Sequence, residues 1–303
     1  MKTFTKRSLV AVLLPAIFFA GCARRNESTV GTPANPLTIV VSPAHAPRDA
    51  AALDVIKKQL ESSTGMTINI SQAPTPADTI KAFDAGRTDV GLVTLEEYLV
   101  AREEYGVHAA LQALRENGLS DYQGVILTKA KGGPVSVAGL AGKKVGFVGP
   151  YSVSGFTLPV SYLNKAGVKV QPVFAASHEE VLKMLVDGKV DAAATYARQI
   201  KHAPGLKVLA YTGTVPNEPL ITRDGLAPEK TEAIEKAFAG LASSPEGAKA
   251  LSAVADITGF KPVDSEVYRP IHDMLRSEGK SVYDMVPDGW DIYHLNQPFM
   301  PER

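Results

Sequence analysis

Five consecutive residues near the middle of the chain are suited to binding an anion. Tyr151-Ser152-Val153-Ser154-Gly155 lies between a predicted strand and a predicted helix. Serine hydroxyls and the free backbone N–H groups at a helix N-terminus bind anions without a cation, and a glycine lets a ligand approach the backbone. We therefore predict ligand contacts from Tyr151, Ser152, Ser154 and Gly155. The alternative is an ordinary serine N-cap, which stabilises a helix by about 1 kcal/mol.

Two further polar residues stand at the ends of predicted elements in the same half of the chain. His178 begins a predicted helix, where its imidazole can donate a hydrogen bond to an anionic oxygen; an isolated histidine is otherwise a structural or surface residue. Ser177 and Glu180 fit a capping box, so we interpret Ser177 as a helix cap. Asp191 opens a predicted strand, where it binds an amine, fixes hydroxyl donors or orders the preceding turn.

In the first half of the chain, the candidate residues follow predicted strands. His45 comes after the first strand, and Thr94 and Tyr98 occupy the start of the helix after the third. Tyr98 either contacts the ligand or packs as a core tyrosine. Glu96 and Glu97 complement the dipole of the same helix. If either carboxylate faces the ligand, an amine-bearing ligand is favoured over simple phosphate.

The elements that must position these residues alternate between short apolar runs and longer helical patterns. The pattern predicts strands over 37–41, 66–70, 89–93, 122–128, 143–148, 173–174, 191–195 and 206–211. It predicts helices over 49–60, 75–85, 154–166 and 177–186, one from about residue 95, and a helical region from 228. Such βαβ units form parallel sheets. Because segment 179–195 echoes segment 78–94, we expect two related α/β lobes.

The N-terminus resembles that of a bacterial lipoprotein. A basic start and an apolar run, 8–20, fit a signal peptide over 1–21 that is too short to span a bilayer permanently. The run ends before Cys22 in a lipobox-like sequence, which predicts lipidation of this cysteine; the alternative is an ordinary signal peptide with a chance cysteine. Without an aspartate after Cys22, the outer membrane is favoured over the inner membrane. Segment 23–36 is predicted to be a flexible tether.

Several motifs at characteristic spacing indicate a known family. These are Leu140-Ala141-Gly142-Lys143-Lys144-Val145-Gly146-Phe147, Ser152-Val153-Ser154-Gly155-Phe156, Pro159, Tyr162-Leu163, Gly167, Ser177-His178-Glu179-Glu180 and Val190-Asp191-Ala192-Ala193-Ala194. Over 37–279 the chain resembles the phosphate/phosphite/phosphonate-binding family of periplasmic solute-binding proteins. The resemblance matches His178, Tyr98 and the loop around His45 to cleft residues of that family, whereas Glu96 and Glu97 depart from its small or uncharged residues.

The resemblance implies a fold and a function. The fold is the two-lobed α/β periplasmic-binding-protein fold of type II, with two crossing strands near 123–128 and 212–222 and a ligand cleft between the lobes. Lobe 1 would comprise 37–124 and 215–280, lobe 2 would comprise 125–214, and 281–303 would form a C-terminal tail.

The implied function is capture of a small anion by hinge closure and its delivery to an ABC permease of the inner membrane, by a monomer. Two alternatives remain open. One is a carrier of an apolar or lipid-like ligand, and the other is a ligand-sensing partner of a membrane receptor.

Composition and motifs argue against other classes of protein. The chain is 45% hydrophobic and 21% charged with a formal charge of zero, as in an ordinary soluble globular protein, and no basic cluster indicates nucleic acid. The six histidines form no short metal-ligand pair, so neither a metal nor a cofactor is predicted. No serine-hydrolase or P-loop motif is present, and Cys22 is the sole cysteine. We therefore expect no enzyme activity.

Overall fold

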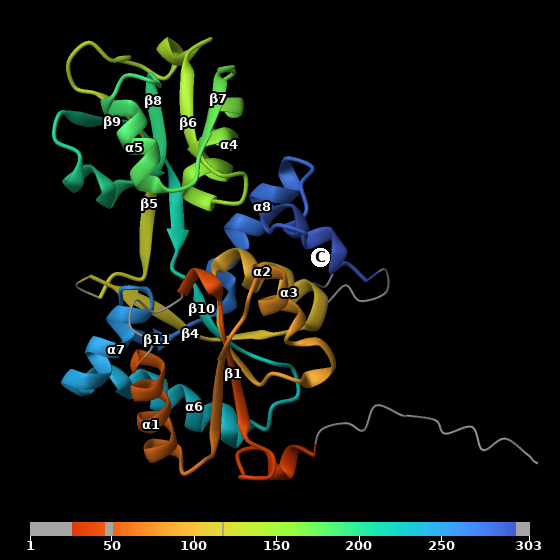
Figure 1. The fold of residues 1–303 in the computed structure, drawn as a ribbon. Coiled ribbons are helices and arrows are strands. Elements are labelled where there is room, and N and C mark those ends of the chain that lie inside the picture. The colour runs from red at the N-terminus through yellow and green to blue at the C-terminus, as the bar shows by residue number, and fades with distance from the viewer. Residues whose placement is uncertain (1–25, 46–50, 117, 295–303) are drawn as a thin grey trace, which may run out of the picture.

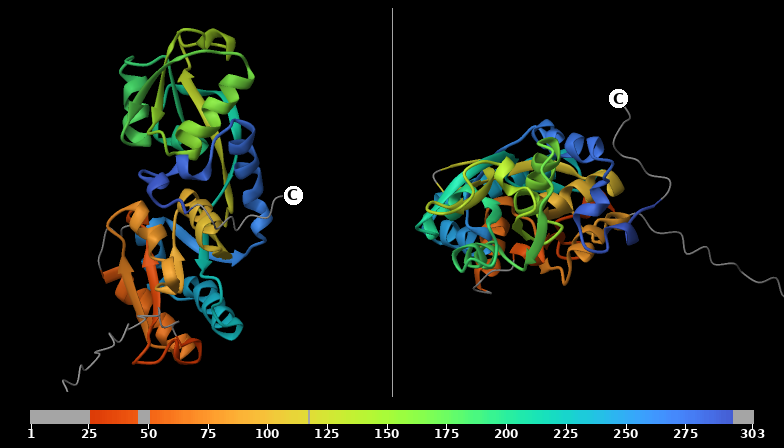
Figure 2. Two further views of the ribbon diagram at one scale, coloured as in Figure 1. Left: turned by 90° about the vertical axis from the view of Figure 1, so that its right-hand side faces the viewer. Right: turned by 90° about the horizontal axis from the view of Figure 1, so that it is seen from above.

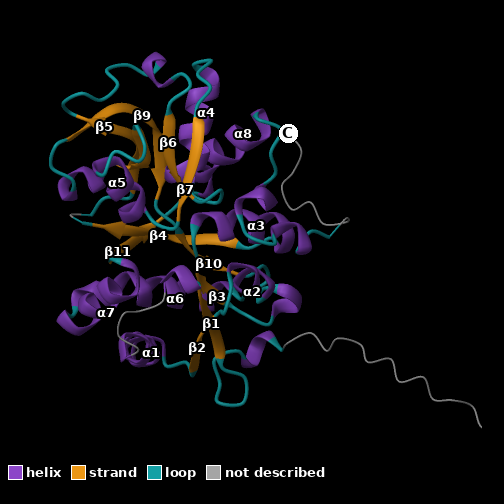
Figure 3. Cartoon of the chain, turned by 45° about the horizontal axis from the view of Figure 1, so that its top comes forward, coloured by secondary structure: helices purple, strands orange, loops and turns teal. Residues whose placement is uncertain are grey.

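A computed structural model describes residues 26–45, 51–116 and 118–294, which form two α/β lobes, one above the other in Figure 1. Each lobe is built on one sheet with helices packed against it (Figure 3). The predicted signal peptide and Cys22 lie outside the described residues. No helix within the described ranges is long and apolar enough to cross a membrane. The predicted fold of two α/β lobes is confirmed.

Lobe 1 contains a six-stranded mixed sheet in the order β11-β4-β10-β3-β1-β2. Its strands are β1 Leu37–Val41, β2 Ile68–Gln72, β3 Val90–Leu92, β4 His108–Arg115, β10 Pro219–Thr222 and β11 Ile257–Pro262. Its helices are α1 Ala51–Thr64, α2 Pro76–Lys81, α3 Leu95–Tyr105, α6 Pro228–Gly240 and α7 Pro245–Ala255. Successive side chains of a strand point to opposite faces, so Ile39 joins the core under α1, α6 and α7, whereas Val40 joins the core under α2 and α3.

Lobe 2 contains a five-stranded sheet in the order β7-β6-β8-β5-β9. Its elements are β5 Asp121–Lys129, β6 Lys144–Val148, α4 Leu158–Lys165, β7 Gln171–Ala175, α5 His178–Val186, β8 Ala192–Tyr196 and β9 Leu206–Pro216. β6 lies parallel to β7 and β8, and β5 lies antiparallel to β8 and β9. Val125 and Leu127 pack toward α5, and Ile126 between them packs toward α4.

The chain crosses between the lobes twice, from β4 to β5 and from β9 back to β10. The second crossing, between Pro216 and Pro219, falls inside the predicted range. The first crossing is made by the start of β5, which spans the gap between the lobes in Figure 1 and pairs there with the end of β9 before it continues into the sheet of lobe 2. Asn217 holds the two crossings together, since its side-chain amide donates to the carbonyls of Ala113, at 3.0 Å, and Leu119, at 2.9 Å.

The described part of the C-terminal segment, up to residue 294, packs between the lobes. It contains α8 Arg269–Ser277 and the short helices Val282–Met285 and Gly289–Asp291, and it lies against both lobes in Figure 2. Tyr283 and Met285 join one buried apolar cluster with residues of α3 in lobe 1 and with Val153 and Leu158 of lobe 2.

The described part of the predicted tether, residues 26–36, is packed against lobe 1. Val30 is only 3% exposed, and the Glu27 carboxylate accepts two hydrogen bonds from Arg223, at 2.6 and 2.5 Å. Arg223 also donates to Asp89, a fully buried residue, at 2.9 Å. This part of the chain is therefore an ordered extension of lobe 1, contrary to the expected flexible tether.

Candidate functional site

The turn that follows β6 begins the helical segment Val153–Thr157, a single π-helical stretch that continues into α4. Ser152 is its N-cap, and its hydroxyl accepts the N–H of Gly155 at 3.0 Å. A side chain at Gly155 would place its Cβ 2.7 Å from Cβ of Val148, so packing inside lobe 2 requires the glycine. The predicted N-cap is therefore present, and it leaves the N–H of Val153 directed out of the turn.

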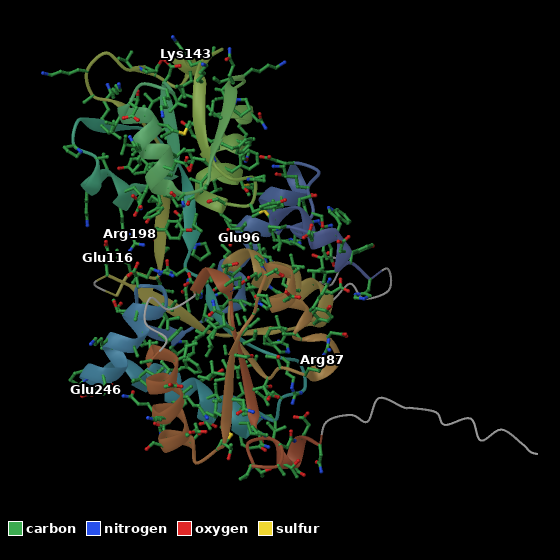
Figure 4. The ribbon with its side chains drawn as sticks, in the orientation of Figure 1. Arg87, Glu96, Glu116, Lys143, Arg198 and Glu246 are labelled. Atoms are coloured by element: carbon green, nitrogen blue, oxygen red, sulfur yellow. The ribbon has the colours of Figure 1, made fainter. Side chains whose placement is uncertain are left out.

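That N–H group makes a contact across the cleft. Val153 N donates to Oε1 of Glu96 in the first turn of α3, with 3.3 Å between the two atoms. Figure 4 shows Glu96 on the side of lobe 1 that faces lobe 2. Burial raises the pKa of the Glu96 carboxyl, and the hydrogen bond from Val153 opposes this shift. A carboxylate oxygen of lobe 1 thus occupies the helix N-terminus of lobe 2, which is a position that favours anions.

A row of hydrogen-bonding side chains continues from this contact into lobe 2. Ser154 is 2% exposed and lies beside Tyr122 on β5, where its side chain opposes the burial that raises the pKa of the Tyr122 hydroxyl. Tyr122 packs edge-to-face on Tyr196 with the ring centroids 5.8 Å apart, and Tyr196 packs on His178 at 4.8 Å. His178 Nδ1 lies 2.8 Å from the hydroxyl of Thr195. The predicted residues Ser154 and His178 therefore belong to one continuous polar and aromatic cluster.

The protonation state of His178 follows from its position. Burial lowers the pKa of His178 to about 4, so the imidazole is neutral near pH 7. A neutral imidazole carries one N–H donor and one acceptor. His178 can therefore offer a hydrogen bond to an anion but not a positive charge.

The cations nearest the hinge are already paired. Arg115 at the end of β4 binds the Glu218 carboxylate through two nitrogens, one of them at 2.6 Å. Burial alone would raise the pKa of the Glu218 carboxyl, but the Arg115 guanidinium holds this pKa below its ordinary value. His45 is 5% exposed with Nε2 3.8 Å from Glu218, and among the described residues its Nδ1 has no hydrogen-bond partner. His45 therefore lies beside the hinge with one unpaired ring nitrogen.

Three predicted site residues have structural roles elsewhere. Thr94 caps α3, because its hydroxyl accepts the N–H of Glu97 while Glu97 accepts the N–H of Thr94 at 2.7 Å. Tyr98 is fully buried against Tyr268, with ring centroids 5.0 Å apart. Asp191 accepts the N–H of Lys144 at 3.0 Å at the start of β6, the end of lobe 2 that is remote from lobe 1.

The remaining predicted residue, Tyr151, is 39% exposed in the turn before Ser152. Among the described residues, no contact joins Tyr151 to the cluster around Tyr122, so its role in ligand binding stays a prediction.

The cleft also contains residues that sequence reasoning did not single out. A cavity of about 330 Å³ lies between the lobes, lined by Glu116, Tyr196, Arg198, Gln199, Ser252, Asp256 and Thr258. Glu116 of lobe 1 lies 3.6 Å from Arg198 and 3.7 Å from Lys201 of lobe 2, across the edge shown in Figure 4. Tyr122 and Tyr196 could have been found as aromatic residues at strand ends. The ion pairs of Glu116 with Arg198 and Lys201 could not have been predicted from the sequence, because they depend on how the two lobes face each other.

The fold and the cleft between its lobes define the class of two-lobed solute-binding proteins. The family model of periplasmic substrate-binding proteins of phosphonate ABC transporters matches residues 39–268. The chain belongs to this family, whose members are transporter components and not enzymes.

Individual relatives agree with this assignment. The phosphate-import protein PhnD of Mycolicibacterium smegmatis is 26% identical over 262 residues, which is 78% of this chain and 81% of that protein. PhnD1 from Prochlorococcus marinus, solved with methylphosphonate, is 16% identical with a TM-score of 0.58, over 81% of this chain and 98% of that one. XAC2383 from Xanthomonas citri, solved with ATP, is 19% identical with a TM-score of 0.66, over 83% and 99% of the two chains. These structures share the fold.

Proposed function

We propose that the chain captures a small oxyanion of the phosphonate or phosphate kind between its lobes, closes on it, and delivers it to an ABC permease. The observation that carries this proposal is the N–H of Val153, which begins a helical segment of lobe 2 and is directed at lobe 1, where an anionic oxygen already accepts it. The family and the relatives named above support this class of ligand.

Neutral donors would bind the anion. The N–H of Val153 lies beside Ser154 and Tyr122. Tyr196 packs on Tyr122 and on the neutral imidazole of His178, which is the last donor of the row. The nearest hinge cation, Arg115, is bound to Glu218. Backbone N–H groups at a helix N-terminus are sufficient for oxyanions, so no free cation is required.

The alternative of an apolar or lipid-like ligand would need apolar side chains such as Val153, Phe156 and Leu158 to line the cleft. Val153 and Leu158 are 1% and 8% exposed in the core that contains the C-terminal segment. Phe156 packs on Phe147 and Phe174 inside lobe 2, with ring centroids 5.6 and 5.5 Å away. These side chains do not wall the cleft, so we do not propose an apolar ligand.

Anchoring and closure complete the proposal. The chain would be lipidated at Cys22 and act as a monomer on the periplasmic side of a membrane, with the outer membrane favoured. The lobes would open about the two crossings, and a ligand that contacts both lobes would favour the closed state by its differential affinity. Identical small-angle scattering with and without a saturating ligand would contradict closure.

Replacement of Val153 by proline tests the anion site directly. Proline removes the N–H but suits the first helical position, and Ser152, with ψ of 122°, already has the extended backbone that a following proline requires. Val153→Ala is the matched control, because it loses similar packing but keeps the N–H. We expect calorimetry with phosphate and methylphosphonate to show binding for wild type and Val153→Ala and a loss of at least about tenfold for Val153→Pro, the equivalent of one hydrogen bond to a charged group. Equal affinities of the two variants would remove this N–H from the site.

A further inference from the structure

Glu96 is a carboxylate placed at the proposed anion site by the protein itself. Its Oε1 accepts the N–H of Val153, whereas the neighbouring Glu97 turns into lobe 1, where it accepts the hydroxyl of Ser42 at 2.9 Å and caps α3 with Thr94. Two adjacent glutamates therefore have different surroundings. Glu97 stabilises one lobe, and Glu96 bridges the two.

The groups that face Glu96 leave its charge uncompensated. Glu218 acts on it from the second crossing and Glu97 from its own helix, and both are acidic, whereas Tyr122 on β5 is a phenol that stays neutral because burial raises its pKa. Arg115 is engaged by Glu218, and the neutral form of the nearby His45 is favoured by burial, which lowers its pKa. Among the described residues no cation forms an ion pair with Glu96. An oxyanion bound at Val153 N–H would therefore meet a carboxylate at close range.

Two ionised acids at such a distance repel each other strongly. At about 4 Å and an effective dielectric constant of about 20, the repulsion weakens binding roughly a thousandfold. Paired acids in buried sites avoid this by sharing one proton, as the two carboxyls of aspartic proteases do. The expectation from the sequence, that a carboxylate facing the ligand favours an amine over simple phosphate, holds for a carboxylate that stays ionised. Sharing of one proton is open to Glu96 and a ligand that is itself a weak acid, and it removes this objection to phosphate.

We propose that Glu96 is the specificity-determining residue of the cleft, and that it admits oxyanions only when a single proton is shared between its carboxylate and an oxyanion oxygen. This inference rests on the proposed function. The ligand class is then an oxyanion with a second ionisation near neutral pH, such as phosphate or an alkylphosphonate. A dianion of a strong acid, such as sulfate, brings no proton, so it can bind only to the fraction of the protein in which Glu96 itself is protonated, and it is bound more weakly than phosphate.

The environment of Glu96 favours this arrangement. Burial raises the pKa of its carboxyl, so a proton is held more readily here than on an exposed glutamate. In the complex, one ligand oxygen would take over the N–H of Val153 and another would form the shared O–H···O bond with Glu96. Above the second pKa of the ligand, each binding event must then take up one proton, so affinity falls about tenfold per pH unit.

Glu96→Gln tests the inference, and Glu97→Gln is the matched control. Glutamine at 96 can donate an N–H to a fully ionised oxyanion, and glutamine at 97 keeps the capping box. Titration calorimetry with phosphate, methylphosphonate and sulfate between pH 6 and pH 9 should show that wild type and Glu97→Gln bind the first two and bind sulfate far more weakly. Glu96→Gln should bind sulfate, and its affinity for phosphate should lose the decline above the second pKa of phosphate.

A second measurement on the unaltered protein keeps the inference testable if Glu96→Gln fails to fold. At pH 8, the heat of phosphate binding should differ between buffers of different ionisation enthalpy by the amount that corresponds to uptake of about one proton. No proton uptake, or equal affinity of wild type for sulfate and phosphate, overturns the inference and leaves the proposed function standing. Failure of wild type to bind any of the three oxyanions overturns both.

Discussion

Removal of one hydroxyl from the C-terminal segment should destabilise the whole protein. Glu104 of α3 is fully buried, and its Oε2 accepts the hydroxyl of Tyr283 at 2.6 Å, while the N–H and imidazole of His294 supply its other contacts. Burial and the Glu104 carboxylate raise the pKa of Tyr283, so this hydroxyl remains a donor at all ordinary pH values. Tyr283→Phe keeps the ring in place and removes only the donor.

The magnitude follows from the loss of one hydrogen bond to a buried charge, which costs about 2 kcal/mol. For a chain of this size, 1 kcal/mol lowers the melting temperature by roughly 2–4 °C, so we expect a decrease of roughly 4–8 °C. Thermal denaturation followed by circular dichroism measures it. Tyr293→Phe is the control, because Tyr293 is 43% exposed and packs on the same ring, and it should change stability by less than about 0.5 kcal/mol. A melting temperature of Tyr283→Phe within 1 °C of wild type, the change that about 0.3 kcal/mol would give, would show that Glu104 does not depend on this donor.

Three further predictions concern the ends and the cleft of the molecule. Asp89→Ala should lower the free energy of unfolding, measured by urea denaturation, by about 3 kcal/mol, because the Arg223 side chain, 8% exposed, loses a fully buried partner. Glu27→Gln should lower it by less than about 1 kcal/mol, because the Glu27 side chain is 39% exposed. Equal losses for the two variants would contradict this ranking. The pKa of His178 is lowered by burial from 6.5 to about 4, so the unfolded chain binds more protons in this range, and stability should fall by about 3 kcal/mol as pH drops from 6.5 to 4. His178→Gln should remove that part of the acid sensitivity, and an unchanged pH profile would argue against a buried imidazole. Cys22→Ser should release the protein from the membrane fraction, and continued sedimentation with membranes would refute lipidation.

Strands that are apolar and short could be predicted from the sequence. The prediction failed where residues that favour helices form strands instead. The predicted strand 37–41 is β1 with the same bounds. β4, His108–Arg115, was missed because its alanines, leucines and glutamine favour a helix. β4 forms a strand because it pairs with β10 on one side and β11 on the other, and these partners are distant in the sequence. β11 was likewise missed in a region predicted to be helical.

The residues that we propose for the site could be named from the sequence at the turn of lobe 2, but the position of Asp191 could not be judged without the direction of its strand. Ligands of open α/β sheets bind beyond the carboxyl ends of the parallel strands. Asp191 precedes β8 and therefore lies at the wrong end, whereas Tyr196 closes β8 and lies beside His178. Glu96 follows β3 by the same rule, but its role depends on the approach of the two lobes, which no local pattern encodes.

Under the proposed closure, the contacts between the lobes are weak enough for a bound ligand to decide between the open and closed states. Exposed ion pairs such as Glu116 with Arg198 contribute about 0–1 kcal/mol each, and the 3.3 Å contact between Val153 N and Glu96 is a long hydrogen bond. The C-terminal segment adds apolar contacts near Val153, together with the hydroxyl of Thr157 at 3.7 Å from the sulfur of Met285. These contacts lie on the helical segment that carries the proposed anion site. The C-terminal segment therefore packs on the turn. Under the proposed function, an oxyanion that replaces the Glu96 contact would add the differential affinity that shifts the population toward the closed state.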